Sequence, residues 1–479
     1  MTGNNLLFLM TDEHQRDAAG CYGHDFVQTP NIDRIAASGT RFTTAYTPSP
    51  ICVPARASLA TGRYVHDCRY WSNAQAYDGR IPSWGHRLIE AGHRCTSIGK
   101  LHYRGNPHDF YGFDEELMPL HIKDEQGWLR GLLRRPLWDW EVTGEFARDI
   151  GPGECTYTHY DRKVAETACE WIKDAARRDD DKPWMLFVSF VSPHYPLIVP
   201  QEFYDLYPLD RLRQPLYMDE DDTNPHPVLN ALRHFMNYGD WFDDHTRKVA
   251  IASYYGLCTF VDDLIGQVVT ALDNSGQSDD TTLIYTSDHG EMLGNHNVWT
   301  KCVMYEDSAA IPMIISGDGI PAGEACDTPV SLVDCYPTIV EHFGVDGRYA
   351  DDAGIAGVSL ARIAKGETPE RTVLSEYHDG GAITGMFMIR HGPWKYIYYP
   401  GYSAQLFNLE TDPTERNNLA HDPNHGGVVG ECHQKLVAVV DADAANELCF
   451  SDQAARIEEC GGREAILASD DYDFTPVPT

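Results

Sequence analysis

A cysteine, a proline and an arginine stand close together near position 52, in a segment with the features of an anion-binding site. Cys52, Pro54 and Arg56 are followed by Thr61-Gly62-Arg63. Pro54 suits the first turn of a helix, and Gly62 can end that helix. Cys52 then lies at a helix N-terminus, where free backbone N–H groups favour an anion, and Arg56 can reach back to the same place. The segment predicts a site for a sulfate or phosphate group, although a cysteine near a proline is usually a small buried hydrophobe.

Four short apolar runs elsewhere in the chain are each followed by titratable side chains. The runs span residues 6–10, 95–98, 184–191 and 282–286, and they are typical of buried strands. Ligands bind beyond the carboxyl ends of the strands in open α/β sheets, so we expect the groups behind these runs to converge on one active site. Taken singly, each histidine or lysine is better explained as a surface or structural residue, and only the set indicates function. The set is Asp12 and Glu13, Lys100 and His102, His194, and Asp288, His289 and Glu291.

Segments with helical spacing separate these runs and define the expected fold. They span residues 30–38, 83–91, 161–178 and 248–275. Strands that alternate with helices favour an α/β fold, in which a large, mainly parallel sheet is flanked by helices on both faces. At 479 residues the chain exceeds one ordinary core, which favours two domains.

The composition changes between about residues 345 and 370, where the chain is rich in glycine and aspartate. Beyond this stretch, the runs 386–390 and 394–399 predict an antiparallel hairpin, and a helix is expected over about 428–444. The last twenty residues are expected to be extended. We therefore expect a catalytic α/β domain over residues 1–365 and a smaller α+β domain, with an antiparallel sheet and a helix, over 366–479.

Charge and cysteine usage narrow the class of protein. With 38 basic and 72 acidic side chains, the formal net charge is −34, which argues against nucleic-acid and membrane partners. The start of the chain lacks the pattern of a signal peptide, and no apolar run approaches the ~20 residues that cross a bilayer. Thirteen cysteines without Cys-x-x-Cys pairs fit reduced thiols better than a disulfide framework. We expect a cytoplasmic protein.

Several of these motifs occur together, and in the same order, in a known family. The chain resembles type I sulfatases of the alkaline phosphatase superfamily over nearly its whole length, and among them the choline sulfatase and phosphonate monoester hydrolase branch. The resemblance implies hydrolysis of a sulfate monoester to an alcohol and inorganic sulfate. It rests on the Cys52-x-Pro54-x-Arg56 signature and on Gly99-Lys100-x-His102, Pro193-His194, Ser287-Asp288-His289-Gly290-Glu291, Trp299-x-Lys301 and Asp412-Pro413-x-Glu415.

The resemblance also implies how the site is assembled. A formylglycine-generating enzyme would oxidise Cys52 to formylglycine, whose hydrate would be the nucleophile. Asp12, Asp288 and His289, with the Cys52-derived group, would bind one divalent cation. Oxygen ligands with one imidazole suit Ca²⁺, with Mn²⁺ and Mg²⁺ as alternatives. Glu13 departs from the family, in which many members have aspartate or glutamine at this position, so its place among the metal ligands is open.

The other charged residues take catalytic roles by the same resemblance. Arg56, Lys100 and Lys301 would neutralise the sulfuryl oxygens. His194 and Lys301 would stabilise or protonate the departing alkoxide. His102 would take the proton of the second hydroxyl of the hydrate, which expels sulfate.

The sequence says less about the substrate. Trp128, Trp138 and Trp140 lie in a loop-rich stretch, and Glu376 stands where choline sulfatases have a pocket carboxylate. An aromatic wall with one carboxylate would suit a quaternary ammonium group, which makes choline O-sulfate a candidate. The alternative is that these tryptophans are ordinary core or subunit-contact residues.

Two other interpretations of the whole site stay open. The same groups could serve a phosphonate monoester or phosphodiester hydrolase, since sulfuryl and phosphoryl groups differ mainly in charge and size. A sulfatase-like binding protein without turnover is the second. Relatives often form dimers or tetramers, and the sequence does not decide between a monomer and a homo-oligomer.

Overall fold

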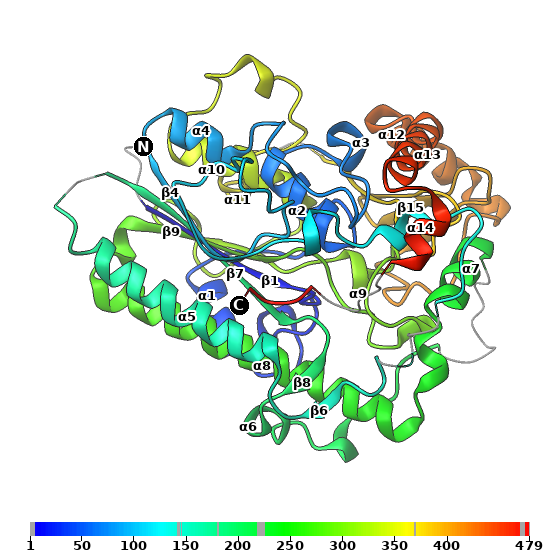
Figure 1. The fold of residues 1–479 in the computed structure, drawn as a ribbon, viewed down its shortest axis with the longest axis horizontal. Helices are drawn as coiled ribbons and strands as arrows, with labels where there is room; N and C mark the ends of the chain where they lie inside the picture. Colours follow the sequence, from blue (N-terminus) through cyan, green and yellow to red (C-terminus); the bar gives the residue numbers. More distant parts are fainter. Residues whose placement is uncertain are drawn as a thin grey trace.

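A large sheet forms the centre of the computed structural model, which describes residues 5–140, 144, 146–179, 182–217, 226–367, 370–469 and 475–478. The sheet has eight strands in the order β11-β2-β10-β9-β1-β7-β4-β5 (Figure 1). Five neighbouring strands are parallel, which confirms the mainly parallel sheet: β9 (Thr281–Ser287), β1 (Asn5–Asp12), β7 (Trp184–Pro193), β4 (Arg94–Lys100) and β5 (Glu115–Leu120).

The other edge of this sheet departs from the parallel pattern. β10 (Met313–Ser316) runs antiparallel to both β9 and β2 (Gly39–Phe42), and β11 (Glu324–Cys326) pairs parallel with β2. The four strands expected from the sequence are β1, β4, β7 and β9, and they are almost completely buried. Their continuous apolar runs are typical of strands covered on both faces.

Helices cover both faces of the sheet (Figure 1). One face carries α1 (Pro30–Ala37), α5 (Thr156–Ala175) and α8 (Asp244–Ser275). The other carries α2 (Cys52–Thr61), α4 (Trp84–Glu90), α10 (Cys335–His342) and α11 (Leu360–Ala364). The four helical segments expected from the sequence correspond to α1, α4, α5 and α8.

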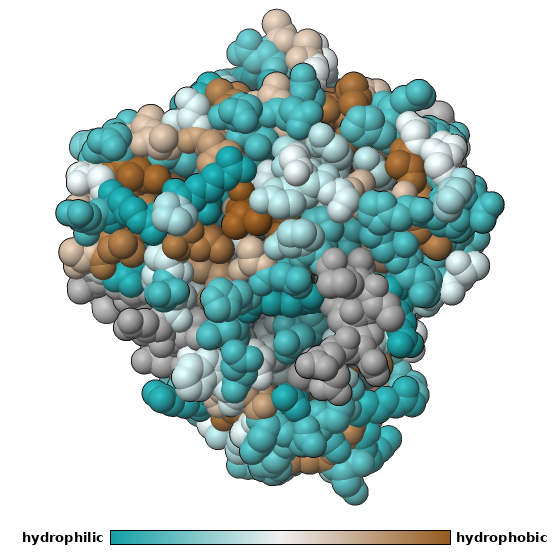
Figure 2. Space-filling view, turned by 90° about the vertical axis from the view of Figure 1, so that its right-hand side faces the viewer, coloured by the Kyte–Doolittle hydropathy of each residue, from teal (hydrophilic) through white to brown (hydrophobic). Residues whose placement is uncertain are grey.

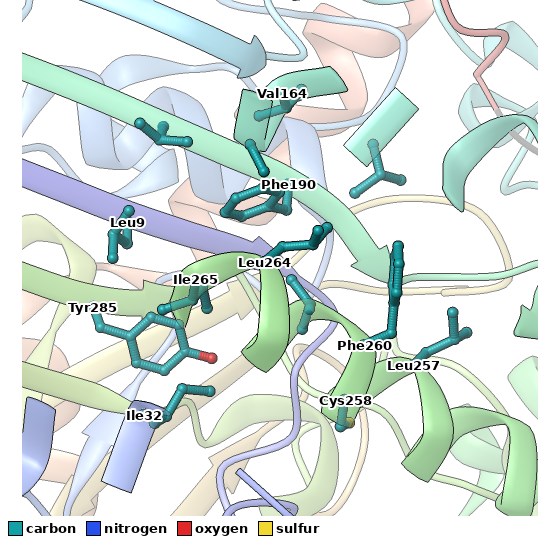
Figure 3. Close-up of a cluster of buried hydrophobic side chains, with 14 of the residues drawn as sticks. Leu9, Ile32, Val164, Phe190, Leu257, Cys258, Phe260, Leu264, Ile265 and Tyr285 are labelled. Atoms are coloured by element: carbon teal, nitrogen blue, oxygen red, sulfur yellow. The ribbon is translucent and has the colours of Figure 1, made fainter. Parts of the chain in front are cut away.

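The core between the sheet and α8 explains why that helix is so apolar. Leu9 of β1, Phe190 of β7 and Tyr285 of β9 meet Leu264 and Ile265 of α8 in one buried cluster (Figure 3). The most apolar window of α8 has a mean hydropathy of 1.2, high enough to pass for a membrane span, but 83% of the window is buried inside the structure. The hydropathy of α8 therefore serves its packing against the sheet.

Short elements complete the part that surrounds the sheet. Two pairs of short strands are parallel: β3 (Ala45–Tyr46) with β12 (Val330–Ser331), and β6 (Ile150–Pro152) with β8 (Leu197–Val199). Among the described residues before 366, the remaining α-helices are α3 (Val65–Cys68), α6 (Gln201–Tyr204), α7 (Pro227–Met236) and α9 (Glu306–Ala309).

The C-terminal part contains the expected antiparallel sheet, with strand order β13-β14-β15-β16. Its strands are β13 (Val373–Tyr377), β14 (Met386–His391), β15 (Trp394–Tyr398) and β16 (Gln405–Asn408), and β14 and β15 form the predicted hairpin. Backbone bonds tie this sheet to the larger part, since Glu376 N donates to Pro48 O at 2.9 Å. The domain boundary near residue 365 stays a prediction.

The helix expected over 428–444 is wrong in extent. The chain instead forms α12 (Gly426–Val439) and α13 (Ala442–Glu459), which are separated by an extended Val440. Asp441 starts the second helix because its side chain accepts from Ala444 N and so caps the new N-terminus. The expectation of an extended end was also wrong in part, because α14 (Arg463–Ala468) follows Gly461 and Gly462.

The surface on the side of the C-terminal helices is mainly hydrophilic. Figure 2 shows this face, on which hydrophobic residues form separate patches among polar ones. This agrees with a formal net charge of −34.

Candidate active site

The titratable groups behind the four predicted strands converge with the start of α2. Ligand atoms of Asp12, Cys52, Asp288 and His289 all lie within 4.8 Å of one another, and all four residues are buried. Cys52 Sγ lies 3.2 Å from His289 Nε2 and 3.7 Å from Asp12 Oδ1. The predicted metal ligands are therefore brought together at the carboxyl end of the sheet.

The start of α2 has the geometry expected from its sequence. Cys52 is the first residue of the helix, its N-cap Ile51 is extended and offers no side-chain cap, and Gly62 ends the helix in the left-handed conformation with φ 66°. Val53 N donates to Asn73 Oδ1 at 3.3 Å. Asn73 was not expected from the sequence, because nothing local links it to Cys52.

The four clustered residues suit a divalent cation. Two buried carboxylates and an imidazole, next to the position of Cys52, provide oxygen and nitrogen donors on a rigid frame. A second cluster of Asp12, Glu13 and His194 adjoins the first. Glu13, whose place was open, thus lies beside the predicted metal ligands, and it is held in the left-handed conformation with φ 68°.

Burial keeps the thiol of Cys52 protonated. Burial, followed by the nearby carboxylate of Asp12, raises the pKa of Cys52 to about 12. A protonated thiol is a poor nucleophile, so the encoded cysteine is poorly suited to attack a substrate by itself.

Arg56 lies behind the carboxylates and not among the residues that line the cavity. Its Nε donates to Asp288 Oδ2 at 2.8 Å, and its Nη2 donates to Asp12 Oδ2 at 3.4 Å. Its Nη1 donates to Lys100 O at 2.8 Å and to Ser189 Oγ at 3.0 Å. Its guanidinium is used to orient two predicted metal ligands, which differs from the expected contact with sulfuryl oxygens.

Two lysines and a histidine face the cavity together with Glu13. Lys301 Nζ donates to Glu13 Oε2 at 2.9 Å, and His194 Nε2 lies 3.4 Å from the same oxygen. Lys100 pairs with Asp12. Burial opposes the charge of Lys301, but the acidic groups around it, among them Glu13 and Asp12, outweigh burial and raise the pKa of Lys301 well above its usual value. Lys301 is therefore a persistent cation beside Cys52.

His102 is held by the far end of the chain. Its Nε2 lies 3.1 Å from Thr475 Oγ1, while its Nδ1 is buried without a hydrogen-bond partner. Tyr157 OH donates to Thr475 O at 2.6 Å, which fixes the backbone there. Burial and then the positive charge of Lys100 lower the pKa of His102 well below its usual value, so its imidazole is neutral. A neutral imidazole can accept a proton, as the predicted role requires.

The outer wall of the cavity is aromatic. The ring centroids of Trp128 and Trp140 are 5.0 Å apart, and both residues line the cavity. Trp138 packs on Phe235 behind them and is not part of the lining. Phe146, Tyr195, Met236 and Tyr238 also line this part of the cavity.

Glu376 is not brought to the cavity. It is fully buried between two histidines, with Oε1 2.8 Å from His66 Nδ1 and Oε2 3.0 Å from His378 Nε2. Burial disfavours its charge, but His66 and His378 together hold the pKa of Glu376 at about 2. The structure therefore gives Glu376 two internal partners in place of the expected substrate contact.

Comparisons with known proteins place this geometry in a family. Residues 4–345 match the sulfatase family, and residues 294–442 match the C-terminal region of N-sulphoglucosamine sulphohydrolase. The chain is 32% identical to choline-sulfatase of Rhizobium meliloti over 88% of its own length and 83% of that protein. It is 29% identical to arylsulfatase K of Danio rerio over 87% and 80% of the two chains. Its fold is similar to phosphonate monoester hydrolase of Agrobacterium radiobacter, with a TM-score of 0.73, 24% identity, and coverage of 91% and 95%.

Proposed function

Because the chain belongs to the sulfatase family and is a sulfuric ester hydrolase, we propose that it cleaves a small sulfate monoester through the hydrate of an aldehyde made from Cys52, beside one divalent cation. The observation that carries this proposal is the buried cluster of Asp12, Cys52, Asp288 and His289 at the N-terminus of α2.

The folded environment of Cys52 argues against the encoded thiol as the nucleophile and so supports a modified group at this position. A thiol with a pKa of about 12 is not ionised at neutral pH. A hydrated aldehyde offers a hydroxyl as nucleophile and a second hydroxyl whose deprotonation releases the sulfate. The neutral imidazole of His102, oriented by Thr475, is suited to accept that second proton. The proposal includes a formylglycine-generating enzyme as the maturation partner.

One divalent cation, held by Asp12, Asp288, His289 and the group at position 52, would supply electrostatic stabilisation of the transferred sulfuryl group. Ca²⁺ is our first choice because two of the side-chain ligands are carboxylates, with Mn²⁺ and Mg²⁺ as alternatives. Arg56 keeps both carboxylates in place from behind through its contacts with Asp288 and Asp12.

Residues that adjoin the predicted metal cluster would act on the leaving group. Lys301 and His194 share the carboxylate of Glu13, which fixes both side chains at the same point of the cavity. From there they can stabilise or protonate the departing alkoxide. Lys100, which also faces the cavity, would balance the charge of the sulfuryl oxygens.

The aromatic wall supports a substrate with a compact apolar or aromatic group on the ester oxygen. Trp128, Trp140 and Tyr238 line the cavity and would provide aromatic surface for such a group. Choline O-sulfate stays a candidate on the same rings, since a quaternary ammonium binds to aromatic faces without a carboxylate. The proposal also places the enzyme in the cytoplasm, where its thirteen unpaired cysteines would stay reduced, and it leaves a homo-oligomer open.

The proposal is tested by the ratio of kcat/KM for 4-nitrophenyl sulfate and the matched 4-nitrophenyl phenylphosphonate, measured with Ca²⁺ or Mn²⁺. Mass spectrometry of the peptide that contains residue 52 gives the fraction converted to the aldehyde. Cys52→Ala, purified in the same way, is the control for contaminating activity. We expect a ratio that favours sulfate. A ratio that favours the phosphonate would reassign the site to that reaction, and a fully converted but inactive protein would indicate a binding protein.

A further inference from the structure

The motif at residues 412–415 has no role in the site described above, yet it lies against the catalytic part of the chain. Glu415 follows the last strand of the C-terminal sheet, is buried, and takes the left-handed conformation with φ 55°. Its Oε2 accepts a hydrogen bond from Glu306 N at 2.6 Å. Glu306 is the first residue of α9, so a residue of the C-terminal part caps a helix of the catalytic part.

A buried lysine from the same sheet completes this contact. Lys395 of β15 is fully buried, and its Nζ donates to Met304 O at 2.6 Å. The same Nζ lies 2.8 Å from Glu306 Oε1 and 2.8 Å from Glu415 Oε1. Two of these contacts link the C-terminal sheet to residues 304–306. The third holds Glu415, which caps the helix that begins at Glu306.

The carboxylate of Glu306 is also fixed from the catalytic side. Tyr46 OH donates to Glu306 Oε1 at 2.7 Å, and Arg16 Nη1 donates to Glu306 Oε2 at 3.0 Å. Burial alone would favour the neutral acid, but Lys395 and then Arg16 lower the pKa of Glu306 to about 2. Glu306 is therefore ionised throughout the neutral pH range, and its carboxylate is held in place by hydrogen bonds as a partner for Lys395.

Lys301 lies just before this anchor, on a segment whose backbone is tied down at both ends. At its start, Thr300 N donates to Glu291 Oε1 at 2.6 Å and Cys302 N donates to Pro50 O at 3.1 Å. Thr300 and Cys302 both have positive φ, 63° and 79°, a conformation that side-chain-bearing residues adopt only when their surroundings impose it. At the far end of the segment, the backbone of residues 304–306 is held by hydrogen bonds to Lys395 and Glu415.

We propose that Lys395, together with Glu415, is a positioning residue for Lys301: it fixes the backbone of residues 302–306 and so places the Lys301 ammonium group at the leaving oxygen. The proposal rests on the function proposed above. It assigns the C-terminal sheet a part in catalysis, although Lys395 and Glu415 are not among the residues that line the cavity.

The role predicts a loss that depends on the leaving group. Esters with a good leaving group need little stabilisation of the departing oxygen, whereas esters of more basic phenols depend on it. A displaced Lys301 should therefore harm the second kind of ester more. A general loss of folded protein would lower activity on all esters by the same factor.

The test compares Lys395→Met with wild type on a series of aryl sulfates from 4-nitrophenyl to 4-methoxyphenyl sulfate. We expect kcat/KM for the most basic leaving group to fall at least about tenfold further than kcat/KM for 4-nitrophenyl sulfate. Lys395→Arg, which keeps the charge, should recover part of the difference. Lys395→Met/Glu415→Gln also removes the carboxylate of Glu415, which has lost its cation, while Glu306 keeps Tyr46 and Arg16; it serves if the single variant does not fold.

Arg371→Met is the matched control, because Arg371 also makes a partly buried ion pair with the larger part, to Asp334 at 2.7 Å, and is not among the contacts of Lys301. It should lower activity on all esters equally or not at all. Hydrogen exchange of the Thr300 and Cys302 amides gives a readout that needs no turnover, and it should be faster in Lys395→Met than in Arg371→Met. Equal losses across the ester series, or unchanged exchange of these amides, would overturn the proposal. Wild type without activity on any sulfate would instead contradict the proposed function and leave the exchange result as the deciding measurement.

Discussion

At the scale of single residues, the site is a set of charges whose partners decide their roles. Arg56 donates hydrogen bonds to Asp288 and Asp12, and Lys301 donates one to Glu13. Each cation therefore has a fixed position before a substrate binds. Such fixed pairs cost no reorganisation during the reaction. The same reasoning separates Glu376 from the site, since both of its oxygens already have internal partners.

Cys52→Ser tests the proposed nucleophile. A serine hydroxyl can attack the sulfuryl group, but it has no second hydroxyl whose deprotonation could release the product. We expect the variant to accumulate a sulfated serine or to be inactive, with at most one turnover, as measured by the intact mass after exposure to substrate. Continued turnover at a rate near that of wild type would contradict the aldehyde hydrate.

Glu376→Gln is expected to change stability and not substrate preference. The folded pKa of Glu376, about 2, lies below its ordinary value of 4.5, so its ionised form stabilises the fold above pH 4.5, and this contribution is lost as the pH falls toward 2. The difference in unfolding free energy from wild type should thus be larger at pH 6 than at pH 3, by at most about 3 kcal/mol. Urea unfolding at the two pH values measures it.

The matching activity measurement uses one cationic and one neutral ester. Glu376→Gln should change kcat/KM for choline O-sulfate and for 4-nitrophenyl sulfate by the same factor. A loss confined to the cationic ester would return Glu376 to the substrate pocket.

At the scale of elements, the end of a strand must be held by hydrogen bonds if the residues that follow it are to be placed accurately. Asp161 of α5 provides such bonds, because its carboxylate accepts from Val191 N at 2.8 Å and from Ser192 N at 2.7 Å. These residues lie near the end of β7, which leads to His194. A helix on one face of the sheet thereby fixes the end of a strand that leads into the cavity.

Asp161→Ala should therefore destabilise the fold and disturb His194. Two buried N–H groups would lose their acceptor, at a cost of about 1–3 kcal/mol each. Chemical denaturation should show that loss, with a smaller one for Asp161→Asn, whose amide oxygen still accepts one bond. Unchanged stability in Asp161→Ala would mean that the end of β7 is held by its neighbours alone.

The elements also show what the sequence could and could not predict. Asp12 and Lys100 end buried strands, and His194 and Asp288 directly follow such strands, so local apolar runs sufficed to bring them together. Thr475 and Asn73 reach the site through contacts across long sequence separations, for which no local pattern exists. The break between α12 and α13 was missed for a local reason. Asp441 caps the start of α13 and so ends the run of helical spacing that predicted one continuous helix.

At the scale of the whole molecule, the predicted cation would join strands β1 and β9 to helix α2. Asp12 ends β1, Asp288 and His289 follow β9, and Cys52 begins α2. A ligand that binds the native state alone adds stability in proportion to the logarithm of its free concentration. Its removal should therefore be visible in global unfolding.

Chelation is expected to lower Tm. At a free cation concentration 100 times Kd, the bound ion adds about 2.7 kcal/mol, which corresponds to a shift of a few degrees in a chain of this size. Differential scanning calorimetry with and without chelator measures it. Asp288→Asn should show a smaller response, and an identical response in both proteins would place the cation elsewhere.

The burial of Cys52 bears on when the proposed modification could take place. The residue is 2% exposed and begins a helix in which every residue is buried, so the folded protein offers no extended segment for a modifying enzyme to bind. Conversion to the aldehyde would have to precede folding, and the two processes would compete for each newly made chain. A host in which folding is faster would accumulate a stable protein that stays a thiol, and enzyme added later could not mature it.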